Sequence, residues 1–445
     1  MQKKVAIIGA GITGLVTAFY LKKNGVDVKV FEKQNRVGGV INSFSENGFI
    51  FETGPNSGVL SNIETVNLFN DLSDYCEIEE ADETSKKRLI WKNNKWNALP
   101  SGLFTAISTP LFTFSDKIRV LGEPFRKKGT NPHENLSDMV KRRLGKSFLD
   151  YAIDPFISGI YAGNTDYLIP KYALPKLYNL EQEYGSFIKG AIKKQKEPKT
   201  EDDKKITKEV FSVKGGLVEL INALAKNIGE ENIKTNCNNL EVKFEDNLFI
   251  VDNEKYTNVV STVNTQAIKE VFSFLGEEEL KNILNLKYAK VVEAAIGFNN
   301  WEGNDIKAFG GLVPGKEKKN ILGVLFMSSI FENRAPKNGA LLTVFAGGTK
   351  REDLFNLPED ELKELIKKDL QEMMGLKTFK PDLFKLFYYE KAIAQYGVDT
   401  KERISAVNNI QDKYKGLFLA GSIVNGVGIA DRIKQATDIA KQICS

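Results

Sequence analysis

The first part of the chain alternates between short apolar runs and a longer amphipathic segment. Residues 5–8 are uniformly apolar, and residues 15–23 and 26–31 follow after a glycine-rich gap. This order predicts a strand, a tight turn, a helix and a second strand. Two strands joined by a helix form a parallel βαβ unit, which is typical of an α/β domain.

The pattern then changes twice. Residues 58–210 lack alternating strands and helices and are rich in Phe, Leu, Pro and Lys, which predicts an inserted, mostly helical domain. Within that stretch, residues 189–208 are almost all charged and predict a solvent-exposed loop. Residues 287–350 alternate apolar and polar positions in short runs, which predicts a mixed or antiparallel sheet.

Three later segments predict a return to the opening domain. Residues 211–216 read as a strand and glycine turn before a helix at 217–228, and residues 258–262 read as another strand. Residues 416–420 predict a last strand, followed by a glycine-rich turn and a helix that begins near residues 428–431. The first and last segments must then meet in space to complete one site.

Three glycines stand directly after the first strand in a G-x-G-x-x-G array. Gly9 makes the turn, Gly11 lets the backbone approach a pyrophosphate, and Gly14 lets the helix pack on the sheet. The helix N-terminus directs free N–H groups at the phosphates. Glu32 closes the second strand, where a carboxylate accepts hydrogen bonds from ribose hydroxyls. Strand, helix and acidic strand end together predict a Rossmann-type dinucleotide-binding domain.

Composition narrows the chemistry. With 62 Lys and Arg against 58 Asp and Glu, the net charge of +4 gives no reason to expect nucleic acid as a partner. The only histidine, His133, rules out a histidine metal cage. Cys76, Cys237 and Cys444 are too far apart to form a zinc or iron–sulfur site. We therefore expect no metal, reduced thiols, and an organic cofactor that supplies the chemistry.

Residues 1–21 resemble a secretion signal only superficially, because the glycines and two threonines interrupt the apolar stretch. No other uninterrupted apolar run approaches the ~18 residues that a membrane span needs. The expected location is cytoplasmic.

The residues after Glu32 narrow the nucleotide to FAD. Lys33–Gly39 followed by residues 48–57 (GFIFETGPNS) resembles the extended FAD fingerprint of the amine-oxidase-like flavoproteins, Glu-x-x-x-Arg-x-Gly-Gly. No second G-x-G-x-x-G appears downstream, which argues against a separate NAD(P)H site. The resemblance implies a non-covalent FAD. Its expected contacts are Gly9, Ala10, Gly11, Ile12, Thr13, Gly14, Glu32, Lys33, Arg36, Gly38, Gly39, Val40, Gly54, Pro55, Asn56, Ser57, Leu240, Thr262, Ser422, Val427, Gly428 and Ile429.

Over nearly its whole length the chain resembles the oxygen-dependent, FAD-containing protoporphyrinogen oxidase family. Beyond the flavin motifs, the resemblance rests on DPFISGIYAGN (154–164), FGGLVP (309–314), residues 322–336, LLTVFAGG (341–348) and LAGSIVNGVGIADRI (419–433). It implies oxidation of protoporphyrinogen IX to protoporphyrin IX in haem biosynthesis. Three hydride transfers to flavin N5 are expected, with dioxygen as acceptor giving hydrogen peroxide and no catalytic side chain.

The resemblance also implies a substrate pocket. Leu312, Leu325 and Phe345 match positions that sandwich the macrocycle, and Ala162 and Gly163 match a turn lining the pocket. Arg88 matches an arginine that pairs with a substrate propionate, a role that suits a guanidinium fork. Asn56 stands where some members carry arginine, and Leu240 replaces a common valine near the adenine.

The implied architecture is α/β (α+β): a Rossmann-type FAD-binding domain with an inserted helical domain and a mixed-sheet substrate domain. The expected boundaries are 1–57, 211–265 and 398–445 for the FAD domain, 81–210 for the helical domain, and 58–80 with 266–397 for the substrate domain.

Alternatives remain open at this point. A coproporphyrinogen III oxidase forming coproporphyrin III differs only by a substrate with two more propionates. Less favoured are an amine oxidase and a non-catalytic relative of the fold. Residues 99–121 place Leu, Phe and Ile beside lysines, which indicates either peripheral contact with the inner face of the cell membrane or a buried helix over the pocket. The sequence does not indicate an oligomeric state.

Overall fold

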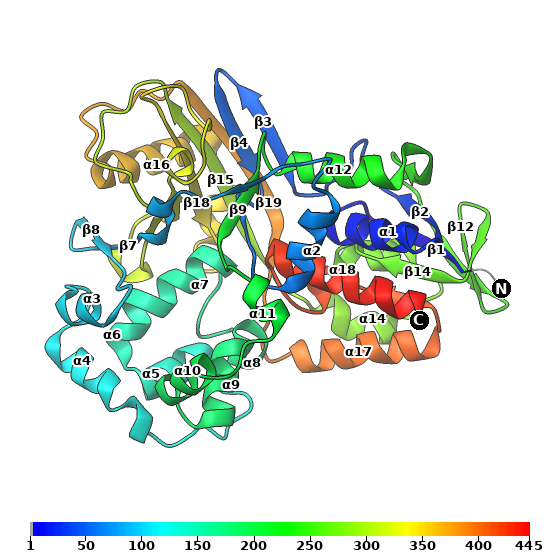
Figure 1. The fold of residues 1–445 in the computed structure, drawn as a ribbon, viewed down its shortest axis with the longest axis horizontal. Coiled ribbons are helices and arrows are strands. Elements are labelled where there is room, and N and C mark those ends of the chain that lie inside the picture. The colour runs from blue at the N-terminus through cyan, green and yellow to red at the C-terminus, as the bar shows by residue number, and fades with distance from the viewer. Residues whose placement is uncertain (1–2) are drawn as a thin grey trace.

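The structure, a computed structural model, describes residues 3–445 (Figure 1). A five-stranded parallel sheet contains the first and last strands of the chain in the order β10-β2-β1-β14-β20. The predicted returns to the opening sheet are therefore confirmed for β14 and β20. The strands are β1 (Lys4–Ile8), β2 (Asp27–Phe31), β10 (Ile233–Lys234), β14 (Asn258–Ser261) and β20 (Leu417–Leu419).

Helices cover both faces of this sheet because β1 is apolar on both sides. Val5 and Ile7 pack under α1 (Ile12–Lys23), which lies between α12 (Val218–Ile228) and α18 (Ile429–Cys444). Ala6 and Ile8 face the opposite layer, whose core continues into the helical segment. That layer contains α13 (Thr265–Val271), α14 (Glu277–Leu284), α17 (Thr400–Lys413) and the hairpin strands β11 (Val242–Glu245), β12 (Leu248–Val251) and β13 (Glu254–Tyr256).

A second, seven-stranded sheet has the order β19-β15-β18-β17-β16-β7-β8. Most neighbours are antiparallel, but β16 and β7 are parallel, so the expected mixed sheet is present. α16 (Glu359–Met373) covers one face, where it packs on alternate residues of β15 and β18. The strands are β7 (Arg88–Lys92), β8 (Lys95–Ala98), β15 (Tyr288–Phe298), β16 (Gly310–Leu312), β17 (Ile321–Leu325), β18 (Ala340–Gly347) and β19 (Leu383–Ala394).

Short strands connect the two large sheets. β3 (Asn42–Glu46) and β4 (Phe49–Thr53) form a hairpin, and β9 (Val210–Val213) pairs with β5 (Gly58–Val59) and β6 (Ile78–Glu80). α2 (Ile63–Asp71) packs beside α18, and α15 (Met327–Ile330) lies against β18.

The helices between β8 and β9 form the lower part of the molecule in Figure 1. Residues 189–208 were expected to be a loop, but α10 extends to Gln195 and α11 spans Glu201–Lys205. Residues 191–205 are exposed, as the charge predicted, and side-chain capping by Thr200 starts α11. The helices are α3 (Leu103–Ser108), α4 (Phe114–Leu121), α5 (Leu136–Arg143), α6 (Lys146–Phe148), α7 (Asp154–Tyr161), α8 (Pro170–Ala173), α9 (Pro175–Tyr184), α10 (Phe187–Gln195) and α11 (Glu201–Lys205).

A buried ion cluster joins these helices. Arg143, at the end of α5, is fully buried and donates through Nε to Glu123 Oε1 at 2.7 Å. Its Nη1 lies 3.3 Å from Glu181 Oε1 on α9. Ser186 and the N–H of Phe187 also bind Glu123, and these hydrogen bonds hold the pKa of Glu123 below its usual value despite burial. Arg143 thus connects α5, α9 and the start of α10.

Arg143→Ala should therefore destabilise the protein by about 3–5 kcal/mol, because it leaves buried Glu123 without its cation and leaves Glu181 with Arg142 as its remaining ion-pair partner. The free energy of unfolding from urea titration measures this. As a control, Lys86→Ala removes an exposed pair with Glu83 and should change stability far less. A loss below about 1 kcal/mol for Arg143→Ala would contradict a supporting role for the cluster.

Candidate flavin and substrate site

The glycine array forms a tight turn at the start of α1. Gly9 has a φ of +101°, which a side chain would disfavour. A Cβ on Gly14 would lie 2.0 Å from the carbonyl oxygen of Gly9, so the helix packs directly on the turn. A Cβ on Gly11 would meet nothing within 4 Å, and no side chain caps α1. The first-turn amides of α1 therefore face open space suited to an anion.

Two charged residues hold the loops beside this turn. The Glu32 carboxylate accepts hydrogen bonds from the N–H of Ala10 at 2.7 Å and of Gln34 at 2.9 Å. The Arg36 guanidinium donates to the carbonyl oxygens of Gly39 at 2.7 Å and Val37 at 3.1 Å. Both side chains thus shape the loop that follows β2.

A second layer of loops closes on the first. Gly38 donates its N–H to Ala10 O at 2.7 Å, and a Cβ on Gly39 would lie 3.3 Å from Gly11 Cα. A Cβ on Gly54 would lie 2.4 Å from Val40 O. Glycine is required at these positions by close approach of backbones. Val40 is nevertheless 56% exposed, which is unusual for an apolar side chain packed between such loops.

The late segments complete this edge of the sheet. Thr262 Oγ1, just after β14, lies 3.1 Å from the carbonyl oxygen of Gly9. A Cβ on Gly421 would lie 3.5 Å from Thr262 O, so the turn after β20 reaches the same point. α18 begins at Ile429, as expected near residues 428–431, and Asp431 caps it by accepting from the N–H of Val427 and Gly428 at 3.3 Å each.

The expected cofactor residues thus fall into three groups. Residues 9–14 and Thr262 meet at the turn, residues 38–40 pack on it, and Gly54 contacts Val40. Ser422 precedes the start of α18, and residues 427–429 lie at that start. Leu240 follows Cys237, whose N–H donates to Glu32 O at 2.9 Å, and it is half-buried. Lys33 is exposed on the same side.

The free face of the seven-stranded sheet alternates large side chains with glycine. Across β16, β17 and β18, one row places Leu312, Gly323 and Phe345 in register. The next row on this face places Gly310, Leu325 and Thr343 in register. Residues in register share a face, so the three apolar side chains stand around gaps left by glycine, and each is half-buried.

The helical segment forms the wall of this face. A Cβ on Gly159 of α7 would lie 2.3 Å from Leu312 Cδ2, so α7 packs directly on the sheet. Ala162 follows α7 with a φ of +45° and accepts from the N–H of Thr349 at 2.8 Å. Buried Gln395 donates to Tyr161 O at 2.8 Å, and its unpartnered Oε1 lies 2.7 Å from where a Cβ on Gly163 would be. Gln395 was not among the predicted site residues.

Arg88 lies at the far end of the same face. It is in register with Gly310, and its guanidinium lies 5.3 Å from the centre of the Phe309 ring. The side chain is exposed, and it forms no ion pair among residues 3–445. β7 and β8 fall within the stretch expected to be mostly helical, but β7 pairs with β16, and β8 with β7, which brings Arg88 to this sheet.

One buried carboxyl on this face was not predicted. Glu293 is in register with Phe345 and is 1% exposed. Its Oε2 accepts from Gly54 N at 2.7 Å, and its Oε1 accepts from Asn56 Nδ2 at 2.6 Å. Burial raises the pKa of Glu293 to about 8. The signal in the sequence is a single charge inside the apolar run VVEAAIGF.

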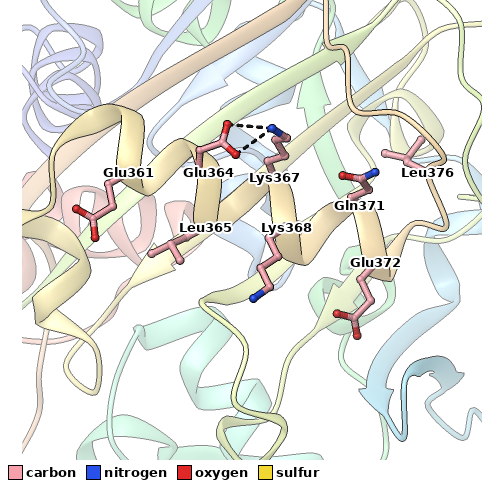
Figure 2. Close-up of a pocket in the computed structure, with 8 residues that line it drawn as sticks. All are labelled: Glu361, Glu364, Leu365, Lys367, Lys368, Gln371, Glu372 and Leu376. Atoms are coloured by element: carbon pink, nitrogen blue, oxygen red, sulfur yellow. Dashed lines mark hydrogen bonds and ion pairs between the residues drawn. The ribbon is translucent and has the colours of Figure 1, made fainter.

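A surface hollow on the outer side of α16 is not part of this site. It has a volume of about 730 Å³ and lies along the outer side of α16, where charged side chains such as Glu364 and Lys367 pair with one another (Figure 2). α16 covers the opposite face of the sheet from Phe345. The sheet therefore separates the hollow from the flavin-type loops.

The sequence profile of the family described as flavin-containing amine oxidoreductases matches residues 12–444. Mitochondrial protoporphyrinogen oxidase of Nicotiana tabacum is 30% identical over 482 aligned residues, which cover 100% of this chain and 95% of the relative. The chain belongs to the protoporphyrinogen oxidase group of the flavin-containing amine oxidoreductases. It is therefore an oxidoreductase of a flavin-containing family.

Two further comparisons bear on this family member. Coproporphyrinogen III oxidase of Bacillus subtilis is 25% identical, over 98% of this chain and 96% of the relative. A crystal structure of a provisionally assigned protoporphyrinogen oxidase from Exiguobacterium sp. 255-15 has a TM-score of 0.81, with 22% identity, 100% of this chain and 99% of that chain covered. This likeness confirms the fold.

The residues present fit a flavin nucleotide. The open space at Gly11 and the uncapped start of α1 suit a pyrophosphate, and exposed Val40 offers an apolar surface beside them. Buried polar atoms without a partner in the described structure lie near the other end of the site: Tyr288 OH and Arg432 Nε. Such atoms are costly to leave unpaired, so they are available to a polar ligand.

Substitutions at two glycines should separate flavin binding from folding. Gly11→Ala places its Cβ in open space, so the flavin-free protein should melt within about 2 °C of wild type. Its FAD affinity should fall at least about tenfold, because the methyl group occupies the space assigned to the pyrophosphate. Fluorescence titration with FAD and thermal unfolding measure the two effects.

Gly14→Ala is the matched comparison, because its Cβ collides with the carbonyl oxygen of Gly9. It should lower stability by about 1–3 kcal/mol as well as flavin affinity. Unchanged FAD affinity in Gly11→Ala would show that the pyrophosphate lies elsewhere.

Proposed function

We propose that this chain binds FAD non-covalently and oxidises protoporphyrinogen IX to protoporphyrin IX, with dioxygen as the final acceptor and hydrogen peroxide as its product. The observation that carries the proposal is the free face of the seven-stranded sheet. Leu312, Leu325 and Phe345 stand on it around glycine gaps, and Glu293 connects it to the turn beside Val40. A flat apolar ligand on this face would lie next to the flavin loops.

A tetrapyrrole suits this arrangement because its broad faces are apolar and its propionates are charged. The alternating large and small side chains of the sheet leave room for a flat ring. Ala162 and Gly163, at the end of the adjoining helix α7, are small and leave space beside this face. Arg88, exposed and without an ion pair in the described structure, is the proposed propionate contact.

The bound flavin would supply hydride acceptance, and the side chains of the chain would orient and shield the substrate. Glu32 and Arg36 would hold the loops at the nucleotide end, and the α18 N-terminus would face the flavin ring. Protons released as the macrocycle becomes aromatic leave through water or substrate nitrogens, so this proposal assigns no catalytic base.

The proposal includes a division of the chain. Residues 1–57, 211–265 and 398–445 would bind FAD, residues 58–80 and 266–397 would bind substrate, and most of 81–210 would form the helical wall. The five strands of the parallel sheet all come from the first three segments, which supports their grouping. Strands β7 and β8 belong with the substrate sheet.

A second candidate substrate is coproporphyrinogen III, favoured by the similarity to the Bacillus subtilis enzyme of that name. Its four propionates would form ion pairs with additional cationic side chains in a site adapted to it. Arg88 is the one arginine at the end of this face among the residues of β7, β16, β17 and β18. We therefore favour the substrate with two propionates.

Aerobic turnover of the FAD-loaded protein tests the proposal. Protoporphyrinogen IX should be converted faster than coproporphyrinogen III, with porphyrin fluorescence and peroxide as readouts. Arg88→Ala should raise KM about 10- to 100-fold with little change in kcat, because a charge-assisted hydrogen bond is lost in substrate binding.

Arg88→Lys should recover only part of this loss, since lysine keeps the charge but not the fork. Lys95→Ala, which removes an exposed charge on neighbouring β8, should leave KM unchanged. Preference for coproporphyrinogen III would move the chain to the second candidate, and a flavin-bound protein that oxidises neither would refute both.

We also propose peripheral membrane contact through α3 and α4. No residue of α4 is buried, and Phe114, Ile118 and Leu121 lie on one side of it, all exposed. Phe104 and Phe125 nearby are 88% and 87% exposed. Exposed Arg119, Lys127 and Lys128 lie among them. Such a patch is suited to an anionic lipid surface. No helix among residues 3–445 is both long and apolar enough to cross a bilayer.

In a flotation assay the wild-type protein should therefore rise with vesicles containing anionic lipid. The double variant Phe114→Ser and Leu121→Ser should stay in the dense fraction, because it removes the two most exposed of the three apolar side chains on this side of α4. Tyr75→Ser, at an exposed aromatic residue elsewhere, is the control and should float like wild type. Absence of flotation by the wild type would end this part of the proposal.

A further inference from the structure

Glu293 lies where the substrate face meets the flavin-type loops. Its neighbours in register are Phe345 on β18 and Phe387 on β19, and it is 1% exposed. It forms no ion pair within residues 3–445, in contrast to Glu123, which binds buried Arg143. Burying a carboxylate without a counter-ion costs free energy, so this position favours the neutral, protonated form of Glu293.

A hydrogen-bond chain runs from Glu293 to the sheet. Glu293 accepts from Gly54 N and from Asn56 Nδ2, and Asn56 Oδ1 accepts from the Thr343 hydroxyl at 2.8 Å. Asn56 Nδ2 also donates to Gly54 O at 3.0 Å. Gly54 in turn contacts Val40, beside Gly39 and the nucleotide turn. The carboxyl is thus attached to the loops that would hold the flavin.

This chain of hydrogen bonds can run in two directions. In the one described, Gly54 N and Asn56 Nδ2 both donate to Glu293, as the carboxylate requires. The acid carries a proton that needs an acceptor, and Asn56 supplies one only when its amide turns. Asn56 Oδ1 then faces Glu293 and Nδ2 donates to the oxygen of Thr343, while the hydrogen bond from Nδ2 to Gly54 O is given up. Protonation of Glu293 and the direction of the Asn56 amide are therefore coupled.

The surroundings of Glu293 favour its protonated form. Burial is the largest cause that raises the pKa of Glu293, to about 8, and Glu52 on β4 adds to it, while the hydrogen bonds from Asn56 and Gly54 act in the opposite direction. β19 contributes Tyr389, whose pKa is raised by burial and by Glu293, with Arg36 acting in the opposite direction. From β18 the neighbours are Phe345 and Thr343, which do not titrate.

We propose that Glu293 is a positioning residue that takes up one proton when negative charge enters the flavin site, and that the Asn56 amide turns with it. The electron pair and one hydrogen nucleus leave the substrate together as hydride. The proton on Glu293 is an additional one from bulk water, and its O–H bond is the only bond of the protein that forms. The inference rests on the flavin site of the proposed function and not on the identity of the substrate.

The test is the pH dependence of the two-electron reduction equilibrium of the FAD-loaded protein between pH 6 and pH 10. Below about pH 8 Glu293 is already protonated, so it contributes no pH dependence. Above about pH 8 its uptake of one proton should add a tenfold change in the reduction equilibrium constant per pH unit. Glu293→Gln should lack this additional dependence and be easier to reduce than wild type at pH 9.

Two variants serve as controls. Asp369→Asn changes a buried carboxyl on α16, on the opposite face of the sheet, and should retain the wild-type profile. Glu52→Gln should also retain the additional pH dependence. The pH at which this dependence begins should be lower than in the wild type, because one negative charge near Glu293 is removed. If the additional pH dependence were lost in Glu52→Gln but kept in Glu293→Gln, the assignment to Glu293 would be wrong.

A measurement on the wild-type chain avoids dependence on a folded variant. Infrared difference spectra of protein labelled with carbon-13 glutamate should gain a protonated carboxyl band on flavin reduction at pH 9. No label-sensitive band, or identical pH profiles for wild type and Glu293→Gln, would refute the inference while leaving flavin binding and porphyrinogen turnover intact. A protein that binds no FAD at all would refute the proposed function and this inference with it.

Stability provides a further readout that needs no flavin. The folded state holds the Glu293 proton more tightly than the unfolded chain, in which the pKa is about 4.3. Glu293 therefore lowers the free energy of unfolding progressively as pH rises from about 4 to about 8. Glu293→Gln should remove this part of the slope, and an unchanged slope would contradict a protonated Glu293.

Discussion

The pairing of β1 with β14 is the constraint on which the rest of the structure depends. β1 ends in the glycine turn, and β14 ends beside Thr262, so parallel pairing brings both ends to one edge of the sheet. Parallel strands require a connection that leaves the sheet and returns. Here the connection contains the helical segment and the first strands of the second sheet. The site forms because the chain must come back to the strand where it began.

The two faces of the seven-stranded sheet have different roles, because successive side chains along each strand point to opposite faces. Even-numbered positions of β15 and β18 pack under α16 in a dry core that fixes the sheet. Odd-numbered positions carry Phe345, Thr343 and Glu293 toward the cofactor loops. Packing on one face thus provides the rigidity with which the other face presents its side chains. Glycines at 310 and 323 leave that second face uneven enough to receive a ligand.

Two buried acids show how the same residue type serves different purposes. Glu123 is paired with Arg143 and binds the N–H groups of α10, so its charge is compensated and it holds helices together. Glu293 receives only neutral donors, and its pKa rises to about 8. A compensated charge stabilises one arrangement, whereas a carboxyl that titrates near neutral pH connects structure to the charge of its surroundings.

Local patterns determined much of this protein. The apolar runs and glycines of the first 31 residues predicted β1, the turn, α1 and β2, and the segments near 258 and 416 predicted the returning strands. The segment near 211 does form a strand, β9, but this strand pairs with β5 and β6 and not with the opening sheet. These features depend on neighbours in sequence, where periodicity and turn chemistry act directly. Local charge also predicted the exposure of residues 189–208, but not their helices, because propensity and capping acted within a solvated stretch.

Only the tertiary structure decided which strands share a sheet and which side chains share a face. β7 and β8 lie within a mostly helical stretch, yet pairing of β7 with β16 carries Arg88 to the seven-stranded sheet. Asn56 and Glu293 are separated by 237 positions along the chain and meet only because the turn after β4 packs on β15. Burial, and with it the raised pKa of Glu293, is a property of that packing. The sequence by itself determined the glycine turn after β1. The tertiary structure decided which carboxyl, Glu293, is buried without a counter-ion, because contacts between distant segments depend on the whole fold.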